Sequence, residues 1–116
     1  MTIIPSTEFK RSFKHLYKKY PSLKSNMEEL KAQLLSNPYA GADLGNGVHK
    51  VRLAIKAKGK GKSGGARVIT YVVEEREDDI IIHLLTIYDK NEISSLSDAF
   101  IRTLVRDVNE NEQNKN

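Results

Sequence analysis

The spacing of apolar residues along this chain changes at Asn37-Pro38. Before this dipeptide, apolar residues recur every three or four positions, which is typical of amphipathic helices. After it, over residues 49–56, they alternate with polar residues, which is typical of a strand that buries one face. Because proline interrupts a helix, the change predicts helices first and a sheet afterwards. With 116 residues, we expect one α+β domain over residues 1–108.

The N-terminal third is predicted to hold a short strand, over residues 2–4, and a helical hairpin. Ser6 and Thr7 can cap the first helix and Ser22 or Ser25 the second, and the two helices end before Pro21 and at Asn37. We interpret their apolar stripes as core: Phe9, Phe13, Leu16, Tyr17 and Tyr20, then Leu23, Met27, Leu30, Leu34 and Leu35.

Three strands and a last helix are predicted beyond the turn-rich stretch 41–47. The strands cover residues 49–56, 66–74 and 80–88, and the first alternates between an apolar and a cationic face. Residues 57–65 hold four glycines and three lysines and are expected to form a mobile loop. A helix over residues 94–108 is expected to close the fold, and the polar tail 109–116 to be disordered.

Positive charge is concentrated in one segment. No acidic residue occurs between Asp43 and Glu74, whereas the chain elsewhere has 12 of its 19 Lys and Arg against 15 Asp and Glu. The seven cations of this basic segment are Lys50, Arg52, Lys56, Lys58, Lys60, Lys62 and Arg67. Such a local concentration on an otherwise acidic chain is expected where a polyanion binds, and nucleic acid is the leading partner. A solvated hairpin tip is the alternative interpretation.

Several classes of site are disfavoured by composition. The chain has no cysteine, and its three histidines lack the spacing of metal ligands, so we expect no disulfide, no cofactor and no metal site. The N-terminus does not resemble a signal peptide, and no apolar run is long enough to cross a bilayer. We therefore expect a cytoplasmic protein that does not contact membrane.

Three segments carry a resemblance to a known family: LGNGVHKVR at 44–52, KGKGKSGGARVITY at 58–71 and LTIYDKNE at 85–92. With the order of the expected elements, residues 2–106 resemble the RelE/ParE superfamily of bacterial toxins, and most closely its RelE-like HigB branch. The resemblance implies a small RelE-like fold, similar to microbial ribonucleases, and a toxin held inactive by an antitoxin encoded beside it. It also implies cleavage of messenger RNA at the ribosome, without metal.

This chemistry requires cations at a phosphate. In metal-free RNA cleavage the 2′-hydroxyl attacks the adjacent phosphorus, and cations stabilise the charge that develops. Arg67 resembles the family arginine at the start of its strand, and Lys50 with Arg52 matches the family's basic pair. The expected catalytic residues are Arg67, Tyr88, Lys90 and Lys58, and the expected phosphate-binding residues are Lys50, Arg52, Lys56, Lys60, Lys62 and Asn91.

The sequence does not assign residues to the roles of general acid and general base. Asn91 stands where many members have an arginine, and Lys90 can compensate for it. Tyr88 or Tyr71 could supply a phenol, although a phenol with its ordinary pKa of about 10 is a poor base. Tyr71 and the histidines His49 and His83 are more readily interpreted as packing residues, His49 as a satisfied core histidine.

Two other functions remain open. A gyrase inhibitor of the ParE type would share the fold without being a nuclease. A module that binds RNA or the ribosome without cutting would use the same lysines only to hold phosphates. Salt-sensitive binding is expected under both the nuclease and the module interpretation, so only a cleavage assay separates them.

Overall fold

The structure is a computed structural model that describes residues 1–56, 59, 61, 64–76 and 78–113. Lys58, Lys60 and Lys62, and most of the loop expected at 57–65, lie outside the described residues. Within the described part, no helix combines the length and the apolar character needed to cross a membrane.

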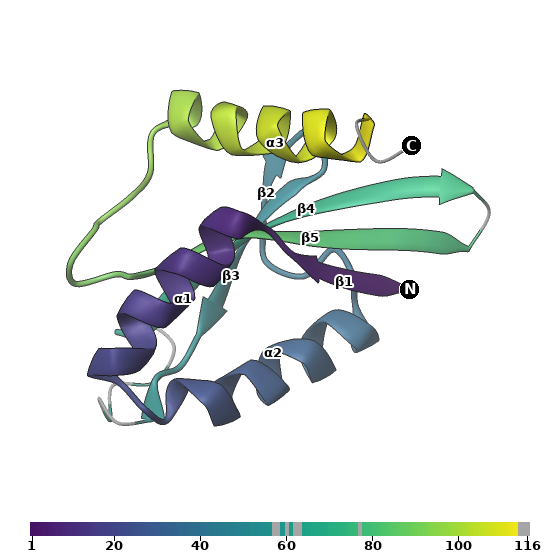
Figure 1. The fold of residues 1–116 in the computed structure, drawn as a ribbon. Helices are drawn as coiled ribbons and strands as arrows, with labels where there is room; N and C mark the ends of the chain where they lie inside the picture. Colours follow the sequence, from purple (N-terminus) through teal and green to yellow (C-terminus); the bar gives the residue numbers. More distant parts are fainter. Residues whose placement is uncertain (57–58, 60, 62–63, 77, 114–116) are drawn as a thin grey trace.

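A mixed five-stranded sheet forms the centre of the molecule, with the strand order β1-β5-β4-β3-β2 (Figure 1). The N-terminal strand pairs in parallel with β5, and the other neighbours are antiparallel. The strands are β1 Thr2–Pro5, β2 Ala42–Gly45, β3 Val48–Leu53, β4 Ala66–Arg76 and β5 Asp79–Asp89. This α+β architecture confirms the predicted fold class, including the N-terminal strand and the helical hairpin.

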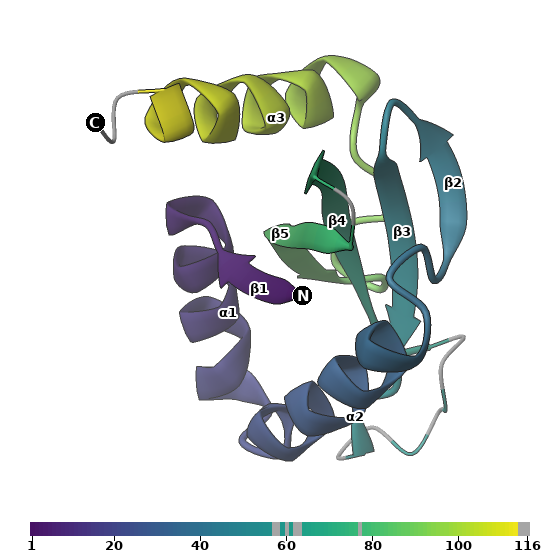
Figure 2. The ribbon, with the colours of Figure 1, turned by 90° about the vertical axis from the view of Figure 1, so that its right-hand side faces the viewer.

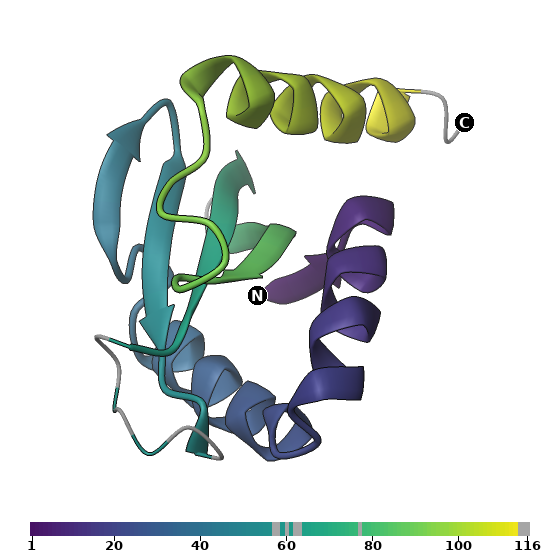
Figure 3. The ribbon, with the colours of Figure 1, turned by 90° about the vertical axis from the view of Figure 1, so that its left-hand side faces the viewer.

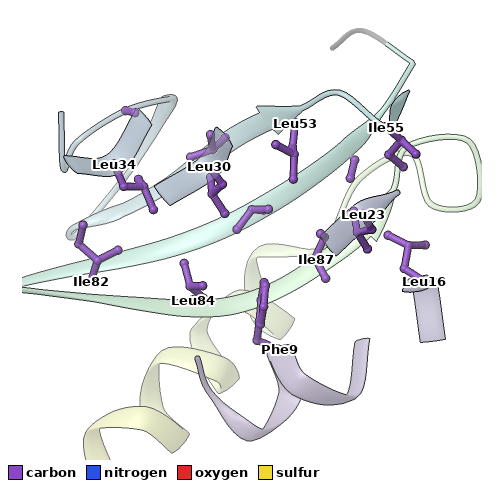
Figure 4. Close-up of a cluster of buried hydrophobic side chains, with 14 of the residues drawn as sticks. Phe9, Leu16, Leu23, Leu30, Leu34, Leu53, Ile55, Ile82, Leu84 and Ile87 are labelled. Carbon is purple, nitrogen blue, oxygen red and sulfur yellow. The ribbon is translucent and has the colours of Figure 1, made fainter. Parts of the chain in front are cut away.

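Helices cover both faces of the sheet (Figure 2). The hairpin of α1 (Thr7–Lys19) and α2 (Leu23–Ser36) packs on one face, and α3 (Asp98–Gln113) packs on the other. The side chain of Ser6 caps α1 by accepting a 3.0 Å hydrogen bond from the amide of Phe9, as expected. Apolar side chains of both hairpin helices meet strands β3, β4 and β5 in the larger core cluster (Figure 4).

The short strand β2 was not predicted. The stretch interpreted as turn-rich forms a hairpin, in which β2 pairs with β3 through a turn at Asn46-Gly47. Both turn residues have positive φ, 55° and 84°, as the favoured two-residue hairpin turn requires. A side chain at Gly47 would also lie 2.7 Å from the carbonyl oxygen of Val72. All four residues of β2 are exposed, so hydrophobic alternation gave no signal for it.

The last helix is shifted relative to the prediction. It begins at Asp98 rather than at residue 94, because the hydroxyl of Ser97 accepts a 3.1 Å hydrogen bond from the amide of Phe100. It continues to Gln113, so the expectation of a disordered tail is wrong for residues 109–113. Tyr71 on β4 donates a 3.3 Å hydrogen bond to the side-chain oxygen of Asn109, which links this extension to the sheet.

Candidate active site

Three polar side chains form a row across the middle of the sheet. In the strand register, Arg52 of β3 is paired with Arg67 of β4, and Arg67 is paired with Tyr88 of β5. Directly paired residues point to the same face of a sheet, so these side chains are neighbours. They lie on the face that α3 covers elsewhere, because Ile69, two positions after Arg67, packs in the α3 cluster.

The row borders an open pocket of about 380 Å³. Four cationic side chains line it, namely those of Lys50, Arg52, Arg67 and Lys90. Its other described lining residues are Gln33, Gly41, Ala42, Tyr88 and Ser94, so none of the described lining residues is acidic. A pocket with this lining favours an anion such as a phosphodiester. Figure 3 shows the side of the sheet on which the segment between β5 and α3 crosses β3 and β4.

Arg67 is the most constrained of these cations. It is 5% exposed, and its Nη1 donates a 3.2 Å hydrogen bond to the carbonyl oxygen of Ala66. Burial, and secondarily the positive charge of Arg52, lowers the pKa of Arg67 below its ordinary value. Even so, an arginine side chain keeps its proton in proteins. A charged guanidinium held beside a second cation gains stabilisation when an anion enters the pocket.

Tyr88 is buried beside this cation. It is 5% exposed, and burial raises the pKa of its phenol above the ordinary value, while the charge of Arg67 acts in the opposite direction. The burial effect is the larger of the two. At neutral pH the phenol therefore keeps its proton, and it suits the donation of a hydrogen bond or a proton rather than the role of a base.

Lys90 is held by the turn that follows β5. Its backbone amide donates a 3.2 Å hydrogen bond to the carbonyl oxygen of Gly65, immediately before β4. The preceding residue, Asp89, is 2% exposed and accepts hydrogen bonds from Tyr20, at 3.2 Å, and from the amide of Asn91, at 2.9 Å. These contacts fix the backbone from which the Lys90 side chain reaches the pocket.

Two of the predicted site residues are not in the pocket. The ammonium of Lys56 lies 3.5 Å from a carboxylate oxygen of Glu29, on α2, because the chain has left β3 and turned toward the hairpin helices. Asn91 is exposed in the turn after β5 and does not line the pocket. Lys58, Lys60 and Lys62 lie outside the described residues.

The structure also adds residues that the sequence did not indicate. Gln33 comes from α2, Ser94 from the segment before α3, and Gly41 and Ala42 from the start of the β2–β3 hairpin. Gly41 has a φ of 95°, and a side chain there would collide with the carbonyl of Lys50. Its glycine identity was the one available signal, because the other contacts arise from tertiary structure alone.

The histidines and Tyr71 lie away from the pocket. The ring of His83 stacks on Tyr71 at a centroid distance of 5.8 Å, and His49 packs edge-on against Tyr39 at 5.9 Å. Both histidines are 5% exposed, as expected for packing residues. The expectation of a satisfied histidine is wrong at one atom, since Nδ1 of His49 has no hydrogen-bond partner among the described residues.

A comparison with models of protein families assigns the chain to a family. Residues 3–115 match the family described as the RelE toxin of the RelE/RelB toxin–antitoxin system. The match spans nearly the whole chain, including all of the strands and helices described above except the first residue of β1. It agrees with the resemblance carried by the three sequence segments. This chain therefore belongs to the RelE toxin family.

Proposed function

We propose that this toxin is a metal-independent endoribonuclease that cuts messenger RNA on the ribosome. The observation that carries the proposal is the buried guanidinium of Arg67, placed between Arg52 and Tyr88 in a pocket whose described lining is cationic. Membership of the RelE family supports the toxin role and an antitoxin partner. We further propose that the chain belongs to the HigB branch and acts in the cytoplasm, where its ribosomal target is found.

In the proposed reaction, the scissile phosphate lies against Arg67, while Lys50 and Arg52 hold neighbouring phosphate oxygens. The 2′-hydroxyl oxygen bonds to phosphorus and loses its proton, and the bond from phosphorus to the 5′-oxygen breaks. The leaving oxygen takes up a proton, so a cyclic phosphate and a free 5′-hydroxyl result. Arg67 stabilises the charge on the non-bridging oxygens, an effect worth about a hundred- to a thousandfold in rate for one preorganised donor.

Tyr88 and Lys90 are the described candidates for moving protons. Burial keeps the phenol of Tyr88 protonated, which suits a donor to the leaving oxygen. Lys90, fixed by the turn after β5, provides a further cation at the same pocket. The predicted catalytic residue Lys58 and the predicted phosphate ligands Lys60 and Lys62 remain candidates for contacts with RNA, and the base is left unassigned.

Primer extension on a message translated in a purified system tests the proposal. Wild type is compared with Arg67→Ala, with a matched control, Arg76→Ala, at an exposed position near the end of β4, and with a reaction lacking ribosomes. We expect cuts that require ribosomes, persist with Arg76→Ala and fall by about a hundredfold or more with Arg67→Ala. Folded wild-type protein that makes no cuts would favour gyrase inhibition or binding alone. Cutting of free RNA at the same rate as translated message would show that cleavage does not require the ribosome.

A further inference from the structure

A second hollow lies between α3 and the β2–β3 hairpin. With a volume of about 600 Å³, it is larger than the pocket at Arg67. Its apolar lining comes from both sides: Leu44 and Val48 from the hairpin, and Ile101 and Val105 from α3. Leu44 is 43% exposed at the edge of this hollow, whereas Val48 and Ile101 are buried, at 5% and 9%. We call this hollow the α3 groove.

Two arginines border the α3 groove. Arg102 and Arg106 are one helical turn apart, and both are exposed. Among the described residues, neither forms an ion pair, although Asp98 and Glu110 continue the same four-residue spacing at the two ends. Like charges at this spacing repel each other across one helical turn. The pair would be stabilised by a carboxylate placed between them.

The α3 groove and the pocket at Arg67 lie along the same face of β3. Val48, Lys50 and Arg52 alternate along β3 and therefore share one face of the sheet. Val48 lines the groove, whereas the two cations line the pocket. Two residues of a strand span about 6.6 Å, so a chain lying in the groove needs to extend only one or two residues further to reach Lys50.

We infer that the α3 groove binds a segment of the antitoxin, and that this segment carries apolar side chains for the floor and a carboxylate for Arg102 and Arg106. The inference rests on the toxin role proposed above and adds the place at which its inhibitor binds. RNA fits the groove less well, because its phosphates would meet an apolar floor and the carboxylates of Asp98 and Glu110. A peptide segment matches both features, as apolar anchors with a charged rim are common at protein interfaces.

Calorimetric titration with the cognate antitoxin, taken as the product of the adjacent gene, tests the inference. All toxin samples carry Arg67→Ala so that they can be expressed. We expect Arg102→Glu with Arg106→Glu to raise the dissociation constant by about tenfold or more, which corresponds to about 1.4 kcal/mol. The matched control is Arg76→Glu, an exposed charge reversal outside the groove, and it should change the constant by less than about twofold.

Hydrogen exchange is measured on the complex without the charge-reversal substitutions, so it locates the binding surface independently of them. Binding in the groove predicts new protection of amides in residues 42–48 and 98–110. Unchanged affinity of the folded double variant, or protection confined to other elements, would overturn the inference. Light scattering of the toxin alone provides a further check. A dimer that the double substitution dissociates would also overturn the inference, because a second copy of the toxin would then fill the groove. None of these measurements involves cleavage, so failure here and failure of the nuclease proposal are separate results.

Discussion

The phenol of Tyr20, immediately after α1, donates a 3.2 Å hydrogen bond to the buried carboxyl group of Asp89 at the end of β5. The two residues are 69 positions apart in the sequence. Asp89 also accepts the amide hydrogen of Asn91, and its carbonyl oxygen accepts those of Glu92 and Ile93. One carboxyl group thus joins the helical hairpin to the turn that carries Lys90, which couples the packing of α1 to the geometry of the candidate active site.

Replacing Tyr20 with Phe should therefore lower the free energy of unfolding. The substitution keeps the ring but removes one donor from a buried acceptor, a loss of about 1–3 kcal/mol. Urea denaturation measures the change. The control is Tyr17→Phe on α1, because Tyr17 is 39% exposed and should change stability by less than about 0.5 kcal/mol. Equal effects of the two substitutions would show that the Tyr20 hydrogen bond adds no stability.

Arg52 and Lys56 should differ in their effects on RNA binding, although both belong to the basic segment. Arg52 lines the pocket, whereas Lys56 is paired with Glu29. We expect Arg52→Ala to weaken binding and to reduce the slope of log affinity against log salt concentration by about one phosphate contact. Lys56→Ala should leave that slope nearly unchanged. Fluorescence anisotropy over a salt series measures both, and the reverse ranking would contradict the placement of these side chains.

The contrast between these two residues shows how far sequence patterns predict the site. Alternation along β3 correctly places Val51 inside and Arg52 on the opposite face, because side chains of any strand alternate. Beyond the end of that strand the alternation still predicts the burial of Ile55, which is 1% exposed, but it does not predict that Lys56 turns toward α2. Ser94 reaches the pocket only through the path of the segment before α3, which local sequence does not encode. Local periodicity therefore predicts faces, whereas the contents of a pocket depend on tertiary packing.

The buried side chain of Asn26 is expected to lower the free energy of unfolding. It lies in the apolar stripe of α2 and is fully buried, and neither its amide nitrogen nor its oxygen has a hydrogen-bond partner among the described residues. An unpaired buried amide costs about 1–3 kcal/mol, so Asn26→Leu, of similar size, should raise the free energy of unfolding by a comparable amount. Asn111→Leu, at an exposed position on α3, is the control. A loss of stability with Asn26→Leu would indicate that the buried amide has a partner or a role.

Tyr88 should make the free energy of unfolding depend on pH in the alkaline range. Burial raises the pKa of its phenol in the folded state above the value of about 10 expected in the unfolded chain. As the pH rises past about 10, the unfolded chain loses this proton first. The stabilisation is therefore complete below about pH 10 and is lost as the pH rises through the folded-state pKa.

Urea unfolding at about pH 8 and about pH 10.5 measures this effect. Tyr88→Phe has no phenol at this position, so it should lose less of its free energy of unfolding between the two conditions than wild type does. Titration of tyrosinate absorbance gives a second readout, because the substitution should remove a component that ionises above about pH 10. If wild type and variant lost equal stability, the phenol would not be held in its protonated form by burial. Its assignment as a proton donor in the cleavage reaction would then lose its physical basis.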